Sequence, residues 1–326
     1  MKYFVRYAIL VTIPILFFFS CSKAQSKDHL SDLKEYKASE IVRMIEKGKP
    51  VTIVNAIIYD DLDLTTINEG VVSSPTQMTV FITQPLYFQS CVFLGKVSAY
   101  SRLSAKGKKS LMAKKVHFGG DVSFIDCDFR KEMVFDESVI DGNLNFTKTI
   151  FTDQASFNHI LVQGTQCMFM GIQANSNFQI IYSTIRGDIS FMDAHFTGTF
   201  SSSSLVAKDL VLNNVQAEKR MDLSEMLLSG ILMFNYGKCA EEVAFAFSNY
   251  MGRVSVIETV FDGGVSFERS HFFGMVKLNH SIFSKGLDTK DAIFYEKPEM
   301  NDVEIKGNEQ PIMIEVKQSE TIKLNY

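Results

Sequence analysis

The feature that most constrains this chain is an eleven-residue repeat that runs from Val122 to about Tyr295 in sixteen consecutive blocks. In each block, positions 1, 3, 6 and 8 are apolar or small. The related segment Leu86 to Asp121 fits the same template if about 14 residues are looped out. A period of this kind indicates a stack of similar units that bury their apolar sides against one another. Position 3 is Phe at residues Phe88, Phe124, Phe135, Phe146, Phe157, Phe169, Phe191, Phe234, Phe245 and Phe267, and position 8 is Phe at Phe93, Phe118, Phe129, Phe151, Phe196, Phe261, Phe272, Phe283 and Phe294.

A period of eleven also suits a right-handed α-helical coiled coil. The pattern inside each block therefore has to distinguish helix from short strands. Positions 1 and 3, and then 6 and 8, alternate as they do in short strands. Glycine recurs at position 10, where a helix would lose about 1 kcal/mol each time. We therefore predict strands separated by corners, and we expect the glycines to supply a positive φ there. These glycines are Gly95, Gly120, Gly142, Gly164, Gly187, Gly198, Gly230, Gly252, Gly263 and Gly274.

The phenylalanines alternate five and six residues apart, as in Phe124, Phe129 and Phe135, and this spacing resembles that of pentapeptide-repeat proteins. The resemblance implies an all-β fold, a right-handed quadrilateral parallel β-helix in which two blocks make one coil of 22 residues. It places positions 1, 3, 6 and 8 inside, with phenylalanine ladders such as Phe124, Phe146, Phe169 and Phe191. The β-helix is expected over residues 51–297 with roughly nine coils. A ten-residue block that contains SSSS, Phe200 to Asp209, predicts a bulge or kink.

Both ends of such a solenoid need a cap. Residues 37–50 predict an N-terminal cap helix with Ser39 as its N-cap and Gly48 as its stop. Pro298 closes the repeat, and residues 298–326 predict a C-terminal cap of one or two strands. An insertion is expected at about 100–115.

The N-terminus has the pattern of an export signal. Lys2 and Arg6 precede an uncharged run, Tyr7 to Ser20, which ends at Cys21 and is shorter than the roughly 20 residues of a spanning helix. The ending resembles a loose bacterial lipobox, although Phe18 departs from the usual leucine. Residues 1–20 are thus predicted to be a lipoprotein signal peptide, Cys21 the lipidated residue and 21–36 a tether. The lipid would anchor the protein to a bacterial membrane, and Ser22 after the cysteine permits sorting to the outer membrane. An ordinary cleaved signal is the alternative.

The net charge excludes a strongly basic nucleic-acid binder, since the sequence has 33 basic and 37 acidic residues and a formal net charge of −4. Removing the two basic residues of the signal leaves 31 − 37 = −6. Four later cysteines, Cys91, Cys127, Cys167 and Cys239, lack the close spacing of zinc or redox motifs. Cys91 and Cys127 share position 6 two blocks apart, which favours a ladder of small buried residues over a disulfide, and the disulfide stays open.

Two surface features are candidate interaction sites. Outward positions 2 and 4 of alternate blocks form an apolar stripe of Ile125, Met168, Met170, Met192, Val211, Met233 and Ile257, opposite a polar face. The alternative is that position 4 turns inward or that the insertion covers the stripe. The insertion carries a basic set that suits an anionic partner, or else is a solvated loop: Arg102, Lys106, Lys108, Lys109, Lys114 and Lys115.

No catalytic motif, cofactor fingerprint or metal spacing is present in the sequence. Two outward groups of charged residues come without a recognisable motif: Asp126 with Asp128 and Asp136, and Glu258 with Glu268 and Arg269. We therefore predict a non-enzymatic, lipid-anchored envelope scaffold without cofactor, metal or nucleic acid, whose partners are the membrane and an envelope protein of unknown identity. The alternatives are a carbohydrate-binding or polysaccharide-cleaving β-helix protein and, with less support, a DNA-mimic that protects topoisomerases.

Overall fold

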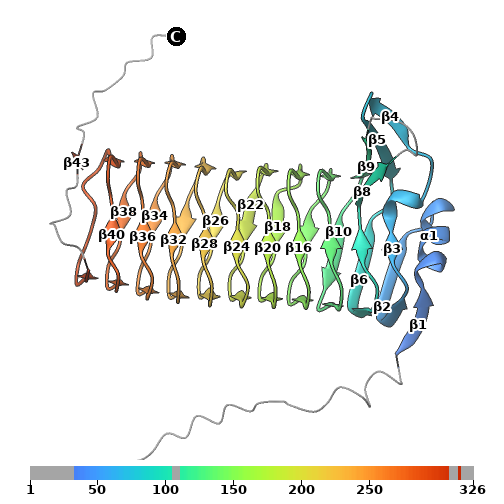
Figure 1. The fold of residues 1–326 in the computed structure, drawn as a ribbon, viewed down its shortest axis with the longest axis horizontal. Coiled ribbons are helices and arrows are strands. Elements are labelled where there is room, and N and C mark those ends of the chain that lie inside the picture. The colour runs from blue at the N-terminus through green and yellow to red at the C-terminus, as the bar shows by residue number, and fades with distance from the viewer. Residues whose placement is uncertain (1–32, 105–110, 308–314, 317–326) are drawn as a thin grey trace, which may run out of the picture. The chain divides into compact units, whose positions relative to one another are not determined.

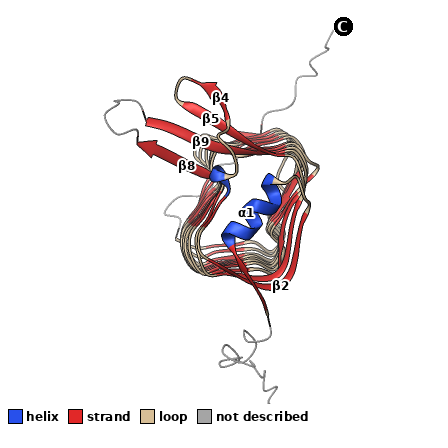
Figure 2. Ribbon diagram, turned by 90° about the vertical axis from the view of Figure 1, so that its right-hand side faces the viewer, coloured by secondary structure: helices blue, strands red, loops and turns tan. Residues whose placement is uncertain are grey.

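The computed structural model describes residues 33–104, 111–307 and 315–316. From Lys34 onward the chain forms a four-sided, parallel β-solenoid of about 12 turns with one short helix near its N-terminal end (Figure 1). Viewed along its axis, the stacked turns superpose as a square outline (Figure 2). This confirms the predicted parallel β-helix.

Each complete turn contributes one strand to each of four faces, which we number in chain order, and partial turns at the two ends add strands to faces 2 and 4. Face 1 contains the first halves of β2 (Val51–Tyr59) and β6 (Leu86–Phe93), then β10 (Val122–Ile125), β14 (Leu144–Asn145), β18 (Gln166–Met168), β22 (Asp188–Ser190), β26 (Leu210–Val211), β30 (Leu232–Met233), β34 (Val254–Ser255) and β38 (Val276–Lys277). Face 2 contains β1 (Lys34–Lys37), the second halves of β2 and β6, β11 (Asp128–Phe129), β15 (Ile150–Phe151), β19 (Gln173–Ala174), β23 (His195–Phe196), β27 (Gln216–Ala217), β31 (Lys238–Cys239), β35 (Val260–Phe261), β39 (Ile282–Phe283) and β42 (Glu304–Ile305).

The other two faces follow the same order. Face 3 contains β3 (Leu62–Asp63), β7 (Val97–Ser98), β12 (Met133–Val134), β16 (Ala155–Ser156), β20 (Phe178–Gln179), β24 (Phe200–Ser201), β28 (Met221–Asp222), β32 (Val243–Ala244), β36 (Val265–Ser266) and β40 (Leu287–Asp288). Face 4 contains β5 (Gln77–Ile82), β9 (Leu111–Phe118), β13 (Val139–Ile140), β17 (Leu161–Val162), β21 (Thr184–Ile185), β25 (Val206–Ala207), β29 (Leu227–Leu228), β33 (Asn249–Tyr250), β37 (His271–Phe272), β41 (Ile293–Phe294) and β43 (Glu315–Val316). The ten strands of face 3 show one coil more than the block count predicted, because residues 51–85 complete a coil of their own.

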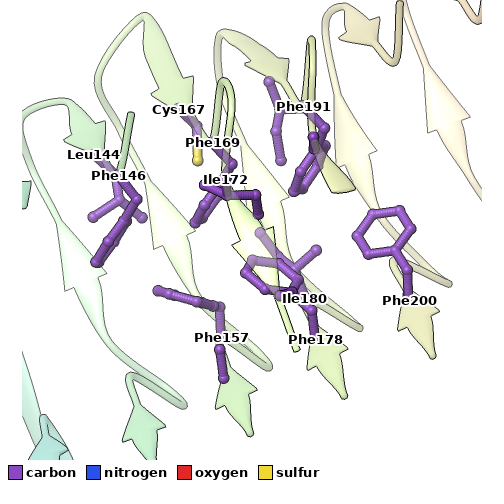
Figure 3. Close-up of a cluster of buried hydrophobic side chains, with 14 of the residues drawn as sticks. Leu144, Phe146, Phe157, Cys167, Phe169, Ile172, Phe178, Ile180, Phe191 and Phe200 are labelled. Carbon is purple, nitrogen blue, oxygen red and sulfur yellow. The ribbon is translucent and has the colours of Figure 1, made fainter. Parts of the chain in front are cut away.

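The phenylalanines of positions 3 and 8 form the core, as predicted. All nineteen are at most 1% exposed. Phe124, Phe146, Phe169 and Phe191 stack in order with ring centroids 5.1–5.5 Å apart and planes within 10° of parallel. Figure 3 shows this part of the core, where side chains from successive coils fill the interior. Buried aromatic stacking of this kind adds to the hydrophobic stabilisation of each coil.

The corners after position 3 have a backbone feature that the sequence did not reveal. The fifth residue of every block has a positive φ of 50–64°, and only one of these sixteen residues is a glycine, Gly171. Left-handed backbone at non-glycine residues is unfavourable, so the stack must hold it in place. Part of that support is a buried hydroxyl at position 6. Thr149 Oγ1 donates to the Phe124 carbonyl at 2.6 Å, and Thr259 Oγ1 donates to the Phe234 carbonyl at 2.7 Å.

The position-10 glycines do not have positive φ, so our expectation for them was wrong. Their role is close packing between coils. A Cβ atom on Gly164 would overlap the carbonyl of Gly142, and one on Gly252 would overlap the carbonyl of Gly230. At each of the predicted position-10 glycines except Gly120, a Cβ would lie less than 3.0 Å from an atom of the neighbouring coil. A side chain at those positions would therefore force the coils apart, which explains why glycine recurs there.

The serine-rich block contains no bulge in its strand pairing. Phe200 pairs with Phe178 on one side and with Met221 on the other, in the same register as its neighbours. The missing residue shortens the corner near Lys208, where Ile189 pairs with Leu210 after 21 residues instead of 22. The predicted bulge is therefore wrong, because a corner absorbs the deletion without shifting either strand.

The N-terminal cap is the helix α1 (Ala38–Glu46), which buries Ala38, Ile41 and Ile45 against the first turn. Its N-cap is Lys37 and not Ser39 as predicted, because β1 pairs with β2 as far as Lys37 and the helix begins directly afterwards. β1 also occupies residues that we had assigned to the tether. Among the described residues, no helix is long and apolar enough to cross a membrane. The predicted signal peptide and Cys21 lie outside the described residues.

At the C-terminal end the repeat continues past Pro298. Lys277 forms an isolated bridge with Glu299, β42 pairs with β39, and β43 pairs with β41. These two short strands lie within the segment for which we predicted capping strands.

The cysteines Cys91, Cys127, Cys167 and Cys239 are buried free thiols. Burial raises the pKa of Cys167, and it raises the pKa of Cys239 to about 12. Burial also raises the pKa of Cys127, whereas a hydrogen bond with Cys127 lowers the pKa of Cys91. Cys91 and Cys127 thus lie next to each other inside the solenoid.

We expect these four thiols to resist alkylation while the protein is folded, because they are inaccessible and Cys167 and Cys239 stay protonated at pH 8. N-ethylmaleimide treatment followed by peptide mass mapping checks this. Full labelling should require urea. Labelling of Cys167 or Cys239 in the folded protein within minutes would contradict the packing described above.

Candidate functional site

Two insertions in the first two coils build a projection that we call the wing. The first insertion forms a hairpin of β4 (Val71–Ser74) and β5, and the second forms a hairpin of β8 (Tyr100–Ser104) and β9. β5 pairs with β9 in parallel over six residues, so the two hairpins join into one four-stranded sheet. The wing extends from face 4 at the N-terminal end of the solenoid (Figure 2). The sequence predicted an insertion at 100–115, but gave no sign that it pairs with the segment around Gln77.

An open groove of about 590 Å³ lies where β8 rises from face 3. Its walls come from the first three coils and the base of the wing. A second hollow of about 370 Å³ lies on the other side of Tyr100 and Arg102, between β4, β9 and Glu137. The first groove is lined by Asp61, Asp63, Lys96, Ser98, Tyr100, Ser101, Arg102, Val134 and Asp136.

The three carboxylates of the groove are held by the backbone and by hydroxyl groups. Asp61 Oδ1 accepts from the Lys96 amide at 2.8 Å, and Asp63 Oδ1 accepts from the Thr65 amide at 2.9 Å. Asp136 Oδ1 accepts from the Asn158 amide at 2.9 Å and from the Ser156 hydroxyl at 2.5 Å. Among the described residues these hydrogen bonds use one oxygen of each carboxylate. The second oxygen of each is left as an acceptor for a bound molecule.

Tyr100 and Arg102 form the wall that both hollows share. Arg102 Nε donates to Tyr100 Oη at 3.1 Å, and the guanidinium lies 5.9 Å from the tyrosine ring centroid. Burial raises the pKa of Tyr100, the Arg102 hydrogen bond opposes this, and Glu137 adds to it. The phenol therefore stays protonated and able to donate a hydrogen bond at neutral pH. Gln77 Nε2 donates to Glu137 Oε2 at 2.5 Å and ties the first hairpin to the corner after β12, on the far side of the second hollow.

The structure places all seven residues of the predicted methionine stripe on face 1 or at its edge, and all seven are half-buried. Met168, Val211 and Met233 share one outward row with Ser190 between the first two. Met170 and Met192 lie in the parallel row two residues further on. These five form one patch over four coils. Ile125 and Ile257 lie apart from it, beyond polar residues of the same rows such as Thr147 and Asn235.

A more exposed apolar surface lies on and beside face 4, and the sequence reasoning missed it. Leu227 is 41% exposed and Met251 43%, and Phe273 stacks on Tyr295 with ring centroids 4.6 Å apart. We call Val206, Leu227, Met251, Phe273, Met275 and Tyr295 the face-4 patch. The signal for it in the sequence is the apolar residues at positions 7, 9 and 11 of alternate blocks.

The predicted basic set is divided by the structure. Arg102 is exposed at the groove, whereas Lys114 is half-buried and its Nζ donates to the Thr65 carbonyl at 3.4 Å. Lys115 lies in β9 and is also half-buried. Lys106, Lys108 and Lys109 lie outside the described residues.

The first of the two outward acidic groups does not converge on one site. Asp136 lines the groove on face 3, whereas Asp126 and Asp128 lie at faces 1 and 2. Burial raises the pKa of Asp128, and Arg130 pairs with it at 2.6 Å. Within residues 33–104, 111–307 and 315–316, no group of three or more His, Cys, Asp and Glu residues is arranged to hold a metal ion.

Comparison with known proteins finds one matching family model. The family model described as pentapeptide repeats (9 copies) matches residues 113–160, which run from within β9 to just after β16. No curated protein and no solved structure matches the chain. The family match and the four-sided solenoid together support a pentapeptide-repeat protein. Proteins of this class are in general structural or interaction scaffolds and not enzymes.

Proposed function

We propose that this protein is a non-enzymatic scaffold, lipid-anchored through Cys21 to the bacterial outer membrane, which binds an envelope protein through the methionine stripe. The observation that carries the proposal is the patch of Met168, Met170, Met192, Val211 and Met233 on four consecutive coils of face 1. Methionine is unbranched and polarisable, so it adapts to an apolar partner, while the paired strands keep the surface rigid.

The anchoring part of the proposal is supported by the sequence around Cys21 alone. Replacing Cys21 by Ala should move the mature protein from the membrane to the soluble fraction after export. Cell fractionation with an antibody measures this, and continued membrane retention of the Ala variant would contradict lipidation at Cys21.

The binding part is tested by crosslinking in cells followed by mass spectrometry. We expect the double variant Met168→Asp with Met192→Asp to lose a partner that the parent protein captures, because two desolvated carboxylates oppose an apolar contact. The matched control is Met251→Asp with Met275→Asp, which places the same change on the face-4 patch. Loss in the control alone, or unchanged capture in the stripe variant, would contradict a role for the stripe.

A further inference from the structure

We propose that the groove at the base of the wing is a binding site for a neutral saccharide, distinct from the methionine stripe. The groove lies on face 3, opposite face 1, and is formed by residues of the first three coils together with the β8 strand. None of its residues takes part in the proposed protein contact.

The chemistry of the lining argues for a ligand rich in hydroxyl groups. The groove offers acceptors on Asp61, Asp63 and Asp136 and donors on Lys96 and Arg102. Ser98, Ser101 and the Tyr100 phenol act as either. A sugar hydroxyl donates and accepts at once, so it can satisfy alternating groups of this kind. The Tyr100 ring supplies the apolar surface on which a sugar ring packs.

The charge of the lining selects against acidic ligands. The lining carries three carboxylates and two cationic side chains, so its formal charge is negative. The Lys96 ammonium is already paired with Glu132 at 2.9 Å. A uronate chain or a nucleic acid would meet net repulsion from these carboxylates. A neutral saccharide meets none.

The polar surface continues beyond the groove, so a chain of several sugars has room. Asn158 Nδ2 donates to Ser156 Oγ at 2.9 Å and to Gln179 Oε1 at 3.3 Å, which forms a hydrogen-bonded row along face 3. The groove itself is open at its surface and holds its carboxylates in fixed positions through backbone amides. Because these contacts fix the carboxylates before any ligand binds, the polar groups of the groove are preformed.

The test is calorimetric titration of the purified full-length protein with defined oligosaccharides. Chitotetraose, cellotetraose and maltotetraose are the neutral probes, tetragalacturonate is the acidic probe, and a lysine-rich peptide tests for a protein ligand. We expect one neutral probe to bind with a Kd of about 0.1–1 mM. Tyr100→Ala and Arg102→Ala should each weaken that binding at least about tenfold, which is about 1.4 kcal/mol.

The control is Arg130→Ala, an exposed arginine on face 2 that should leave saccharide binding unchanged. The stripe variant Met168→Asp with Met192→Asp should also bind the saccharide normally, so failure of the proposed protein contact and failure of this site are distinguishable. The proposal is overturned if no neutral probe binds, if the acidic probe or the peptide binds more tightly, or if Tyr100→Ala binds like the parent.

Discussion

Replacing Phe146 by Ala is expected to lower the free energy of unfolding by about 3–5 kcal/mol. Phe146 is fully buried and lies between the stacked rings of Phe124 and Phe169, at centroid distances of 5.2 and 5.5 Å. Removing the ring leaves a cavity that the neighbouring coils cannot fill, because their strands are fixed by hydrogen bonds on four faces. Urea denaturation followed by circular dichroism measures the change.

The control for this experiment is Phe247→Ala. Phe247 is 46% exposed at a corner, where Arg269 lies 5.8 Å from its ring centroid. The same loss of a ring should cost less than about 1 kcal/mol there, because little buried area is lost. Equal losses in the two variants would contradict an inward phenylalanine ladder.

Replacing Gly252 by Ala is expected to destabilise the solenoid by about 1–3 kcal/mol or more, although alanine suits strands better than glycine. The new Cβ would overlap the Gly230 carbonyl, and Gly274 repeats the same contact one coil further on, with 2.7 Å between its Cβ position and the Gly252 carbonyl oxygen. Backbone atoms cannot turn aside as side chains do, so the coils must separate. Thermal unfolding measures the shift.

Gly264→Ala is the matched control for this prediction. A Cβ on Gly264 would have a single neighbour within 4 Å, the Lys285 carbonyl oxygen at 3.9 Å, and its φ is not positive. We expect this variant to be neutral or to gain about 0.4–1 kcal/mol from a less flexible unfolded chain. If Gly252→Ala were as stable as Gly264→Ala, close packing would not explain glycine at position 10.

The core was predictable from the sequence because it depends on a period. A side chain such as Phe124 recurs with its neighbours at a fixed spacing, and burial follows from the pattern alone. The role of Gly252 was not predictable, because glycine suits both a positive φ and a close backbone approach, and only coordinates separate these reasons. The positive φ at residues such as Tyr236 could not be predicted from the sequence either. It is imposed by the stacking of the coils and not by the type of residue.

The groove could be predicted only in its parts. The sequence points to Arg102 for its charge and to Asp136 for its outward position. The strand that carries Arg102 to the groove is held by pairing with β9, which in turn pairs with β5 across 36 residues of sequence. Pairing between two hairpins depends on long-range geometry that a repeat does not encode. The face-4 patch, in contrast, was present in the sequence at positions 7, 9 and 11 of alternate blocks.

The shortened corner near Lys208 shows how a solenoid of this kind can tolerate the loss or gain of residues in its sequence. One residue is missing there, yet Phe200 and Leu210 keep the register of the strands on either side. The wing shows the opposite change, since two long insertions at another corner leave the pairing of Val97 with Leu62 and Met133 intact. Residues can thus be lost or gained at the corners while the strands of each face keep their register. New binding elements can be added to such a rod one corner at a time, without rebuilding its interior.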